Sequence, residues 1–285
     1  MKRRIMIRRR TVGAFFCLGP WALSCAVFAP SVSRADDQDV IDYRQHIMKT
    51  LGEQAMAIDQ IVKQKAPPDH LATHVEILAI TASTAKKAFE PQVQGGQAQA
   101  AVWTNWAEFA QRMDELAANT NELLKATKVG GVTATSLKLA STLTCKGCHD
   151  TFVEKASPTA SPAAGQDAVE YREHMMKTLN EQSGALGQIL SSAIADDNAV
   201  AHLEVIALAA SITEKSFEPK VPGGQSKPEV WSNWADFSKR MHEFASKTAA
   251  VAKLANEKGA EAGLANVLDA LQCKSCHDLY RQEKK

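Results

Sequence analysis

Apolar positions recur every three or four residues along most of the chain, which is the spacing of an amphipathic helix. Strand-like alternation is lacking, so the pattern predicts an all-α protein. The first helical stretch ends before Pro67-Pro68. Three more follow at about residues 71–89, 102–116 and 132–155, and Gly130-Gly131 separates the last two. The core face of the first stretch contains Ile41, Arg44, Met48, Leu51, Ala55, Ile58 and Val62.

This pattern occurs twice, 128 residues apart, and no insertion interrupts the match. The matching segments include Tyr43-Arg44 and Tyr171-Arg172, Phe89-Glu90-Pro91 and Phe217-Glu218-Pro219, and Gly95-Gly96-Gln97 and Gly223-Gly224-Gln225. Residues 156–165 have the Pro, Ala and Ser content of a short linker. The sequence therefore predicts two tandem antiparallel four-helix bundles, over residues 36–155 and 166–285.

Each copy carries two cysteines and a histidine near its end, as Cys145-Lys146-Gly147-Cys148-His149 and Cys273-Lys274-Ser275-Cys276-His277. This spacing is the attachment motif of a c-type haem, in which both thiols add to vinyl groups and the histidine binds iron. A zinc half-site and a redox dithiol are the rival readings. Zinc would need a partner pair for each motif, and a dithiol of the thioredoxin type would need a βαβ setting. We therefore expect two covalent haem c groups, held by Cys145, Cys148, Cys273 and Cys276, with His149 and His277 as proximal iron ligands.

Residues 1–35 have the features of a signal peptide. Six Lys or Arg residues precede an apolar run, and Ser33-Arg34-Ala35 offers a cleavage site before Asp36. Cys25 is an alternative lipoprotein cysteine. Cleavage after Ala35 would remove Cys17 and Cys25 and leave only the four motif cysteines, so we expect no structural disulfide. No other apolar run reaches the length of a membrane span, and we expect a soluble periplasmic protein.

Removal of this segment changes the charge of the protein. The whole chain has 33 basic and 32 acidic residues, and residues 1–35 hold seven basic and no acidic ones. The remaining 26 basic and 32 acidic residues give a net charge of −6. This balance argues against nucleic acid as a partner and favours redox partner proteins with a basic or mixed-charge face.

A four-helix repeat with its haem motif at the C-terminal end resembles the class II cytochromes c, which comprise cytochrome c' and its low-spin relatives. The resemblance covers nearly all of the chain after the signal segment, twice. Its most specific parts are the terminal haem motif and the first-helix pattern Tyr-Arg-x-x-x-Met-Lys, at Tyr43 to Lys49 and Tyr171 to Lys177. It implies a haem bound at the C-terminal helix of each bundle, and pairing of the two domains or of two chains through first helices.

The distal iron ligands predicted are Met48 and Met176, on the core face of each first helix. In the low-spin relatives a methionine at the matching place binds iron, and His/Met ligation raises the reduction potential. In high-spin cytochrome c' the site is apolar and vacant, and a methionine there is a packing residue. Met175, about 100° round the helix, should miss the iron.

Arg44 and Arg172 lie four residues before these methionines, on the same face. Because a buried unpaired charge is costly, we expect each to bind a haem propionate, with a solvated head group as the alternative. The repeated histidines are expected to be surface residues, solvated or hydrogen-bonded, and not iron ligands. They are His46, His74, His174 and His202.

These features predict a dihaem electron carrier, not an enzyme. A gas-binding protein with five-coordinate iron, taking up nitric oxide or carbon monoxide, is the alternative. A dihaem peroxidase is the weakest hypothesis, because no acid–base pair is evident. The copies differ after the haem motif, where Tyr280-Arg281 replaces Phe152-Val153, and this predicts two unequal haem potentials.

Overall fold

The computed structural model describes residues 36–154 and 167–283. The predicted signal segment and the predicted linker lie outside these residues. The helices of the first repeat are α1 (Asp37–Val62), η1 (Pro68–His70), α2 (Leu71–Ala85), η2 (Lys87–Phe89), α3 (Ala101–Thr104), α4 (Trp106–Thr142) and α5 (Cys145–Phe152). Those of the second are α6 (Asp167–Leu190), η3 (Asp196–Asn198), α7 (Ala199–Thr213), η4 (Glu214–Phe217), α8 (Glu229–Ser232), α9 (Trp234–Lys258), α10 (Ala260–Ala270) and α11 (Cys273–Tyr280).

The all-α prediction is confirmed, because the described residues form helices and only isolated β-bridges. Helix α1 begins where the sequence supplies a cap: the Asp36 carboxylate accepts a hydrogen bond from the Asp39 backbone N–H at 2.9 Å. It ends at Val62, and Gln64 then turns the chain in a left-handed conformation (φ 60°), with the Lys65 backbone N–H donating to Gln60 O at 2.8 Å.

A glycine in the left-handed region divides the third helix from the fourth in both repeats. Gly131 (φ 55°, ψ −139°) bends α4, and Thr127 and Thr135 share a hydrogen bond of 2.7 Å on either side of it. Gly259 (φ 93°) separates α9 from α10. Residues other than glycine rarely adopt these angles. Each repeat is therefore a four-helix bundle, followed by a short helix that carries the haem motif.

The predicted fourth helix over about 132–155 is wrong in one respect. The helix stops at Thr142, and Leu143 and Thr144 leave the helical path before α5 begins at Cys145. The second repeat has the same break between α10 and α11. Helical periodicity alone could not reveal this break, because no proline or glycine marks it.

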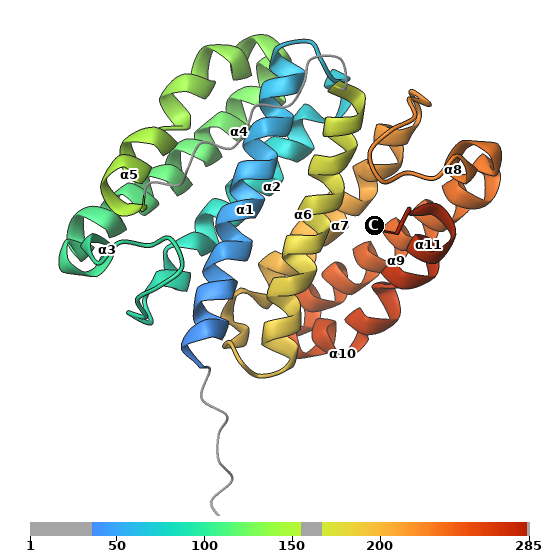
Figure 1. Ribbon diagram of the computed structural model, residues 1–285. Coiled ribbons are helices and arrows are strands. Elements are labelled where there is room, and N and C mark those ends of the chain that lie inside the picture. The colour runs from blue at the N-terminus through green and yellow to red at the C-terminus, as the bar shows by residue number, and fades with distance from the viewer. Residues whose placement is uncertain (1–35, 155–166, 284–285) are drawn as a thin grey trace, which may run out of the picture. The chain divides into compact units, whose positions relative to one another are not determined.

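The two repeats share one continuous core. Helices α1 and α6 lie side by side (Figure 1), and the apolar cluster includes fully buried residues of both repeats, such as Ile47, Leu78, Leu186 and Ile206. The described part of the chain clusters as one compact unit. Hydrophobic burial thus joins the repeats as well as folding each one.

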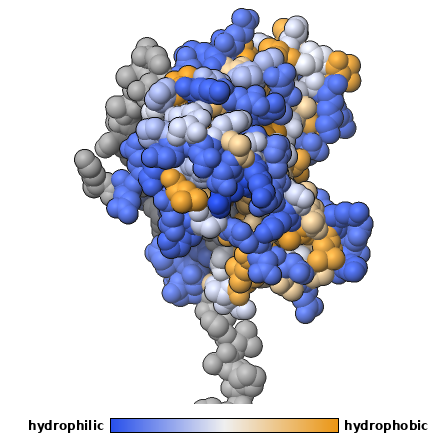
Figure 2. Space-filling model, turned by 90° about the vertical axis from the view of Figure 1, so that its right-hand side faces the viewer, coloured by the Kyte–Doolittle hydropathy of each residue, from blue (hydrophilic) through white to orange (hydrophobic). Residues whose placement is uncertain are grey.

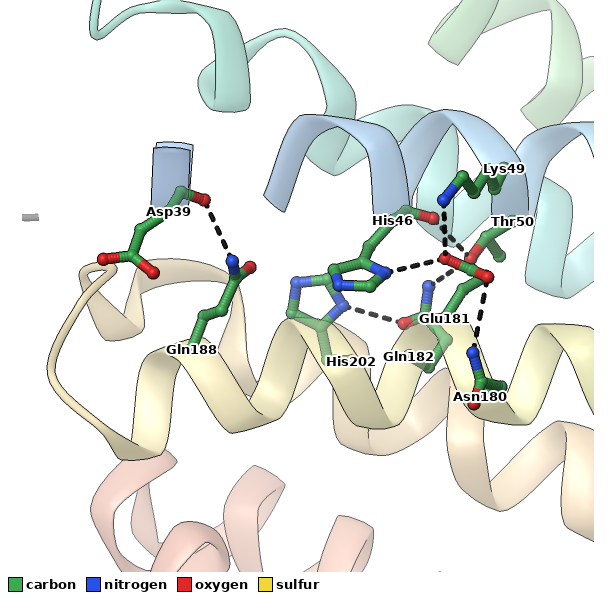
Figure 3. Close-up of polar contacts among 9 residues, drawn as sticks. All are labelled: Asp39, His46, Lys49, Thr50, Asn180, Glu181, Gln182, Gln188 and His202. Carbon is green, nitrogen blue, oxygen red and sulfur yellow. Dashed lines mark hydrogen bonds and ion pairs between the residues drawn. The ribbon is translucent and has the colours of Figure 1, made fainter. Parts of the chain in front are cut away.

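A buried polar network crosses this interface twice, with the same residue types at positions 128 apart. The Tyr43 hydroxyl is 2.8 Å from His202 Nε2, and His202 Nδ1 is 2.8 Å from Gln182 Oε1. The Gln182 amide then donates to Thr50 Oγ1 at 2.8 Å (Figure 3). Every polar side chain in this chain of contacts therefore has a partner, as buried polar groups require.

The equivalent series of contacts in the other direction runs from Tyr171 to Thr178. The Tyr171 hydroxyl is 2.7 Å from His74 Nε2, and His74 Nδ1 is 2.9 Å from Gln54 Oε1. The Gln54 amide donates to Thr178 Oγ1 at 2.7 Å. The repeats are therefore related by a pseudo-twofold arrangement of contacts, the form that an isologous interface takes.

The prediction that the repeated histidines are surface residues is wrong for His74, His174 and His202. His74 and His202 are 0% and 2% exposed, and His174 is 7% exposed. His46 lies 2.7 Å from Glu181, and His174 lies 2.6 Å from Glu53, both across the repeat boundary. Reasoning from one sequence missed them because part of what covers each histidine comes from the other repeat, such as Tyr171 beside His74 and Tyr43 beside His202.

We expect the two halves, expressed separately as residues 36–160 and 161–285, to form dimers. Each half carries every residue type of the network, so its exposed face would be complementary to itself and to the other half. Analytical ultracentrifugation of each half and of their mixture, with the intact protein as reference, tests this. Soluble monomeric halves would show that the interface is dispensable.

We expect the free energy of unfolding to fall as the pH drops below about 6.5. Burial lowers the pKa of His74 to about 3 and that of His202 to about 4. Both are neutral in the folded protein, whereas the unfolded chain binds protons near pH 6.5. As the pH falls from 6.5 to the pKa of the folded state, each histidine lowers the free energy of unfolding by about 1.4 kcal/mol per pH unit. Above pH 6.5 it has no such effect. Urea unfolding at pH 7 and pH 5 measures the loss of unfolding free energy between these pH values. The loss should be smaller for the double variant His74→Leu/His202→Leu than for the wild type, and an equal loss would contradict the assignment.

Candidate functional site

The haem motifs form the short helices α5 and α11 at the end of each repeat. Cys273 is exposed and Cys276 is half-buried, and both thiols are free. The first-repeat pair, Cys145 and Cys148, has the same exposure. Because the cysteines stand three residues apart on a helix, both point to one side, and the histidine at the next position lies close to them. This arrangement suits two thioether bonds to one macrocycle with the imidazole beneath it.

A cavity of about 550 Å³ lies beside α11 in the second repeat. Its wall includes Cys273, Cys276 and His277 from α11, and Met176 from α6. Apolar residues of α9, among them Phe237, complete part of the lining. The two side chains predicted to bind iron, Met176 and His277, are therefore brought to the same cavity from helices about a hundred residues apart in sequence.

The residues present fit a covalent haem. The cavity volume lies within the ordinary range for ligand sites, roughly 300–1,000 Å³. Two free thiols and an imidazole stand at its wall, and burial lowers the pKa of His277, which favours the neutral form that binds iron. Among the described residues, no three His, Cys, Asp or Glu side chains gather as metal ligands, so the rival zinc site lacks the extra donors that it needs.

In the first repeat, Met48 and Cys148 are both half-buried, and each packs against the shared core. In the second repeat, Met176 corresponds to Met48. The residue before it, Met175, is fully buried in the shared core and does not line the second-repeat cavity. Iron ligation by Met48 and Met176 stays a prediction.

Arg44 and Arg172 are buried, each with 2% of its surface exposed. Their guanidinium groups donate to backbone carbonyls, Arg44 to Val93 and Gly95, and Arg172 to Val221 and Gly223. The partner that a buried charge requires is thus already supplied by the chain. Pairing with a haem propionate stays a prediction.

The two motif helices are anchored in different ways. In the second repeat the Tyr280 hydroxyl donates to Asp236 at 2.6 Å, and Arg240 Nε donates to the same carboxylate oxygen at 2.6 Å. In the first repeat the equivalent ring is Phe152, and Arg112 donates instead to the Gly147 carbonyl inside the haem motif, at 3.1 Å. Tyr280 stands in the second repeat where the first has Phe152. This difference therefore changes the hydrogen bonds beside the haem motif as well as the polarity of the ring.

Sequence reasoning missed the loop residues that contact the motif helices. The backbone N–H of Gln99 donates to Phe152 O, and that of Lys227 donates to Tyr280 O, both at 2.9 Å. The available signal was repetition, since Gly95-Gly96-Gln97 recurs just before each of these positions.

Two helical bundles with a haem-attachment helix at the end of each define a c-type cytochrome with two haem sites. A family model described as Cytochrome C' matches residues 39–153 and 167–281. The chain belongs to the cytochrome c' family, in two tandem copies, and binds two covalently attached haem c groups.

Known relatives each match about two fifths of the chain, the length of one repeat. Cytochrome c' of Alcaligenes xylosoxydans xylosoxydans is 28% identical over 127 residues, which is 43% of this chain and 98% of the relative. Cytochrome c' of Pararhodospirillum photometricum is 30% identical, over 42% of this chain and all of the relative. Cytochrome c-556 of Agrobacterium tumefaciens (strain II Chrys) is 30% identical, over 39% and 94%.

Solved structures give the same match to one repeat. The ferrous variant of cytochrome c prime from Alcaligenes xylosoxidans with bound NO is 26% identical, with a TM-score of 0.41, over 43% of this chain and 98% of that one. A carbon monoxide-bound variant of the same protein is 26% identical, with a TM-score of 0.40, over 43% of this chain and 99% of that one.

We expect the purified protein to carry two haems that survive acid-acetone extraction. Replacing Cys273 and Cys276 together by Ser should leave one haem, because both thioether bonds of the second site are lost. The pyridine haemochrome spectrum, set against the protein concentration, counts the haems. The matched control is the pair Cys145→Ser/Cys148→Ser, which should also leave one. Two covalent haems in either variant would contradict the assignment.

Proposed function

We propose that this protein is an exported, periplasmic dihaem electron carrier, with Met48 and His149 as axial ligands of one iron and Met176 and His277 as those of the other. It acts without catalysing a reaction of its own. Bound haem supplies one-electron oxidation and reduction of iron, and the protein contributes axial ligands, burial and hydrogen bonding.

The observation that carries the proposal is the placement of Met176 and His277 on the wall of one cavity, together with both cysteines of the second motif. A thioether and an imidazole on one macrocycle would fill both axial positions. Iron with both positions filled exchanges electrons without taking up a substrate, and this favours a carrier over an enzyme.

The surroundings of the second site suit docking of a partner protein. Cys273 is exposed, so one edge of the macrocycle would lie near the protein surface. The surface seen in Figure 2 is mainly hydrophilic, with hydrophobic residues in small separate groups. Among the described residues, no helix is long and apolar enough to cross a membrane. With the net charge of −6 expected after export, a redox partner with a basic or mixed-charge face fits best.

Gas binding is the second candidate function. Family membership favours it, because two solved variants of cytochrome c prime from Alcaligenes xylosoxidans hold nitric oxide and carbon monoxide. The cavity of about 550 Å³ also reaches beyond Met176 to apolar residues such as Leu179 and Phe244. In this case Met176 would pack beside the iron without binding it.

The spin state of the ferric protein separates these functions. We expect a low-spin wild-type protein with a weak thioether-to-iron absorption band in the red. Met176→Leu keeps the side-chain volume and removes the sulfur, so the second haem should turn high-spin and bind carbon monoxide after reduction. Met175→Leu is the matched control and should stay low-spin. A wild-type protein that is high-spin at both haems would overturn the electron-carrier proposal and favour gas binding.

A further inference from the structure

A buried arginine links the methionine helix of each repeat to the loop that follows the second helix. In the second repeat Arg172 extends from α6, four residues before Met176, and donates to Val221 O at 2.8 Å and to Gly223 O at 3.2 Å. In the first repeat Arg44 donates to Val93 O at 2.5 Å and to Gly95 O at 3.2 Å.

Two aromatic rings hold each guanidinium in place. The Arg172 Cζ atom lies 5.4 Å from the ring centroids of both Phe217 and Trp231. The corresponding distances for Arg44 are 5.3 Å to Phe89 and 5.2 Å to Trp103. Each tryptophan also donates its Nε1–H to the carbonyl of that phenylalanine, at 2.9 and 3.0 Å. Stacking and carbonyl contacts together offset the desolvation of the buried charge.

The same loop is bonded to the haem-motif helix at its other end. We define the bridging loops as residues 90–100 and 218–228. In the second, the Lys227 N–H donates to Tyr280 O at 2.9 Å, and the Gln225 carbonyl accepts from the Gln282 N–H at 2.8 Å. In the first, the Gln97 carbonyl accepts from the Glu154 N–H, also at 2.8 Å. Each bridging loop therefore connects the helix that carries the methionine to the helix that carries the proximal histidine.

We propose that Arg44 and Arg172 are positioning residues, which hold the bridging loops and thereby fix the separation of the two axial-ligand helices. Guanidinium geometry explains the residue type, because one planar group reaches two carbonyls and stacks between two rings at once. A lysine ammonium is a compact point charge and cannot do both.

This role differs from propionate binding in a way that can be measured. A propionate partner would pair with the positive charge, which Arg172→Lys keeps even though the two-point geometry is lost, and this pairing does not hold the bridging loop. A positioning residue acts through its planar fork, so the same substitution would release the loop although the charge remains.

The test is hydrogen–deuterium exchange of the intact dihaem protein carrying Arg172→Lys. We expect the amides of residues 218–228 and 280–282 to exchange about tenfold faster or more, which corresponds to about 1.4 kcal/mol of local opening. Residues 90–100, in the same molecule, are the internal control and should be unchanged. Arg44→Lys should accelerate exchange in residues 90–100 and leave residues 218–228 unchanged. This readout does not depend on whether methionine binds iron.

The spin state of the second haem is a further readout, which rests on the proposed His/Met ligation. If that ligation holds, Arg172→Lys should produce a high-spin fraction at the second haem alone. Arg172→Met serves as a second variant, with the stem retained and the donors removed, and should accelerate loop exchange at least as much. Unchanged exchange of residues 218–228 in Arg172→Lys would overturn the positioning role. Faster exchange in a protein that is high-spin already in the wild type would retain it and reject only the ligation.

Discussion

The pairing of α1 with α6 is the contact on which the rest of the structure depends. Helix α6 carries Met176 to the cavity beside the second haem motif, and both helices direct polar side chains towards each other, namely Thr50, Gln54, Thr178 and Gln182. Each such buried hydrogen bond contributes only about 1 kcal/mol net, but a broken one leaves a buried group unsatisfied at a cost of roughly 1–3 kcal/mol. The network therefore restricts the register at which the helices can pack.

The register of α1 against α6 also determines where the other helices lie. With α1 and α6 paired, α2 and α7 also meet across the interface, and the haem-motif helices α5 and α11 lie against α4 and α9 of their own repeats. The arginines Arg44 and Arg172 connect the paired helices to the bridging loops, and the loops connect to the motif helices. The pairing thus extends from the buried interface to both haem sites through contacts that occur twice.

Repetition does not make the two sites equal. Tyr280, Asp236 and Arg240 form a hydrogen-bonded set beside the second motif, while Arg112 binds the Gly147 carbonyl inside the first. Hydrogen bonds and charges near a haem are among the factors that set its potential. In a protein whose two haems differ in potential, one haem is reduced before the other. In a symmetric dimer of identical subunits the two haems are equivalent, so no such order is set.

The sequence by itself determined the features that depend on local spacing: the two cysteine–histidine motifs, the 128-residue repeat, the helical period and the helix break at Gly130-Gly131. These follow from covalent and short-range constraints, which a single chain segment expresses alone. Only the tertiary structure decided that His74 and His202 are buried, that the repeats share a core, and that Arg44 and Arg172 bind carbonyls. Those outcomes depend on what covers each side chain, and the covering residues come from segments about 20 to 160 positions away.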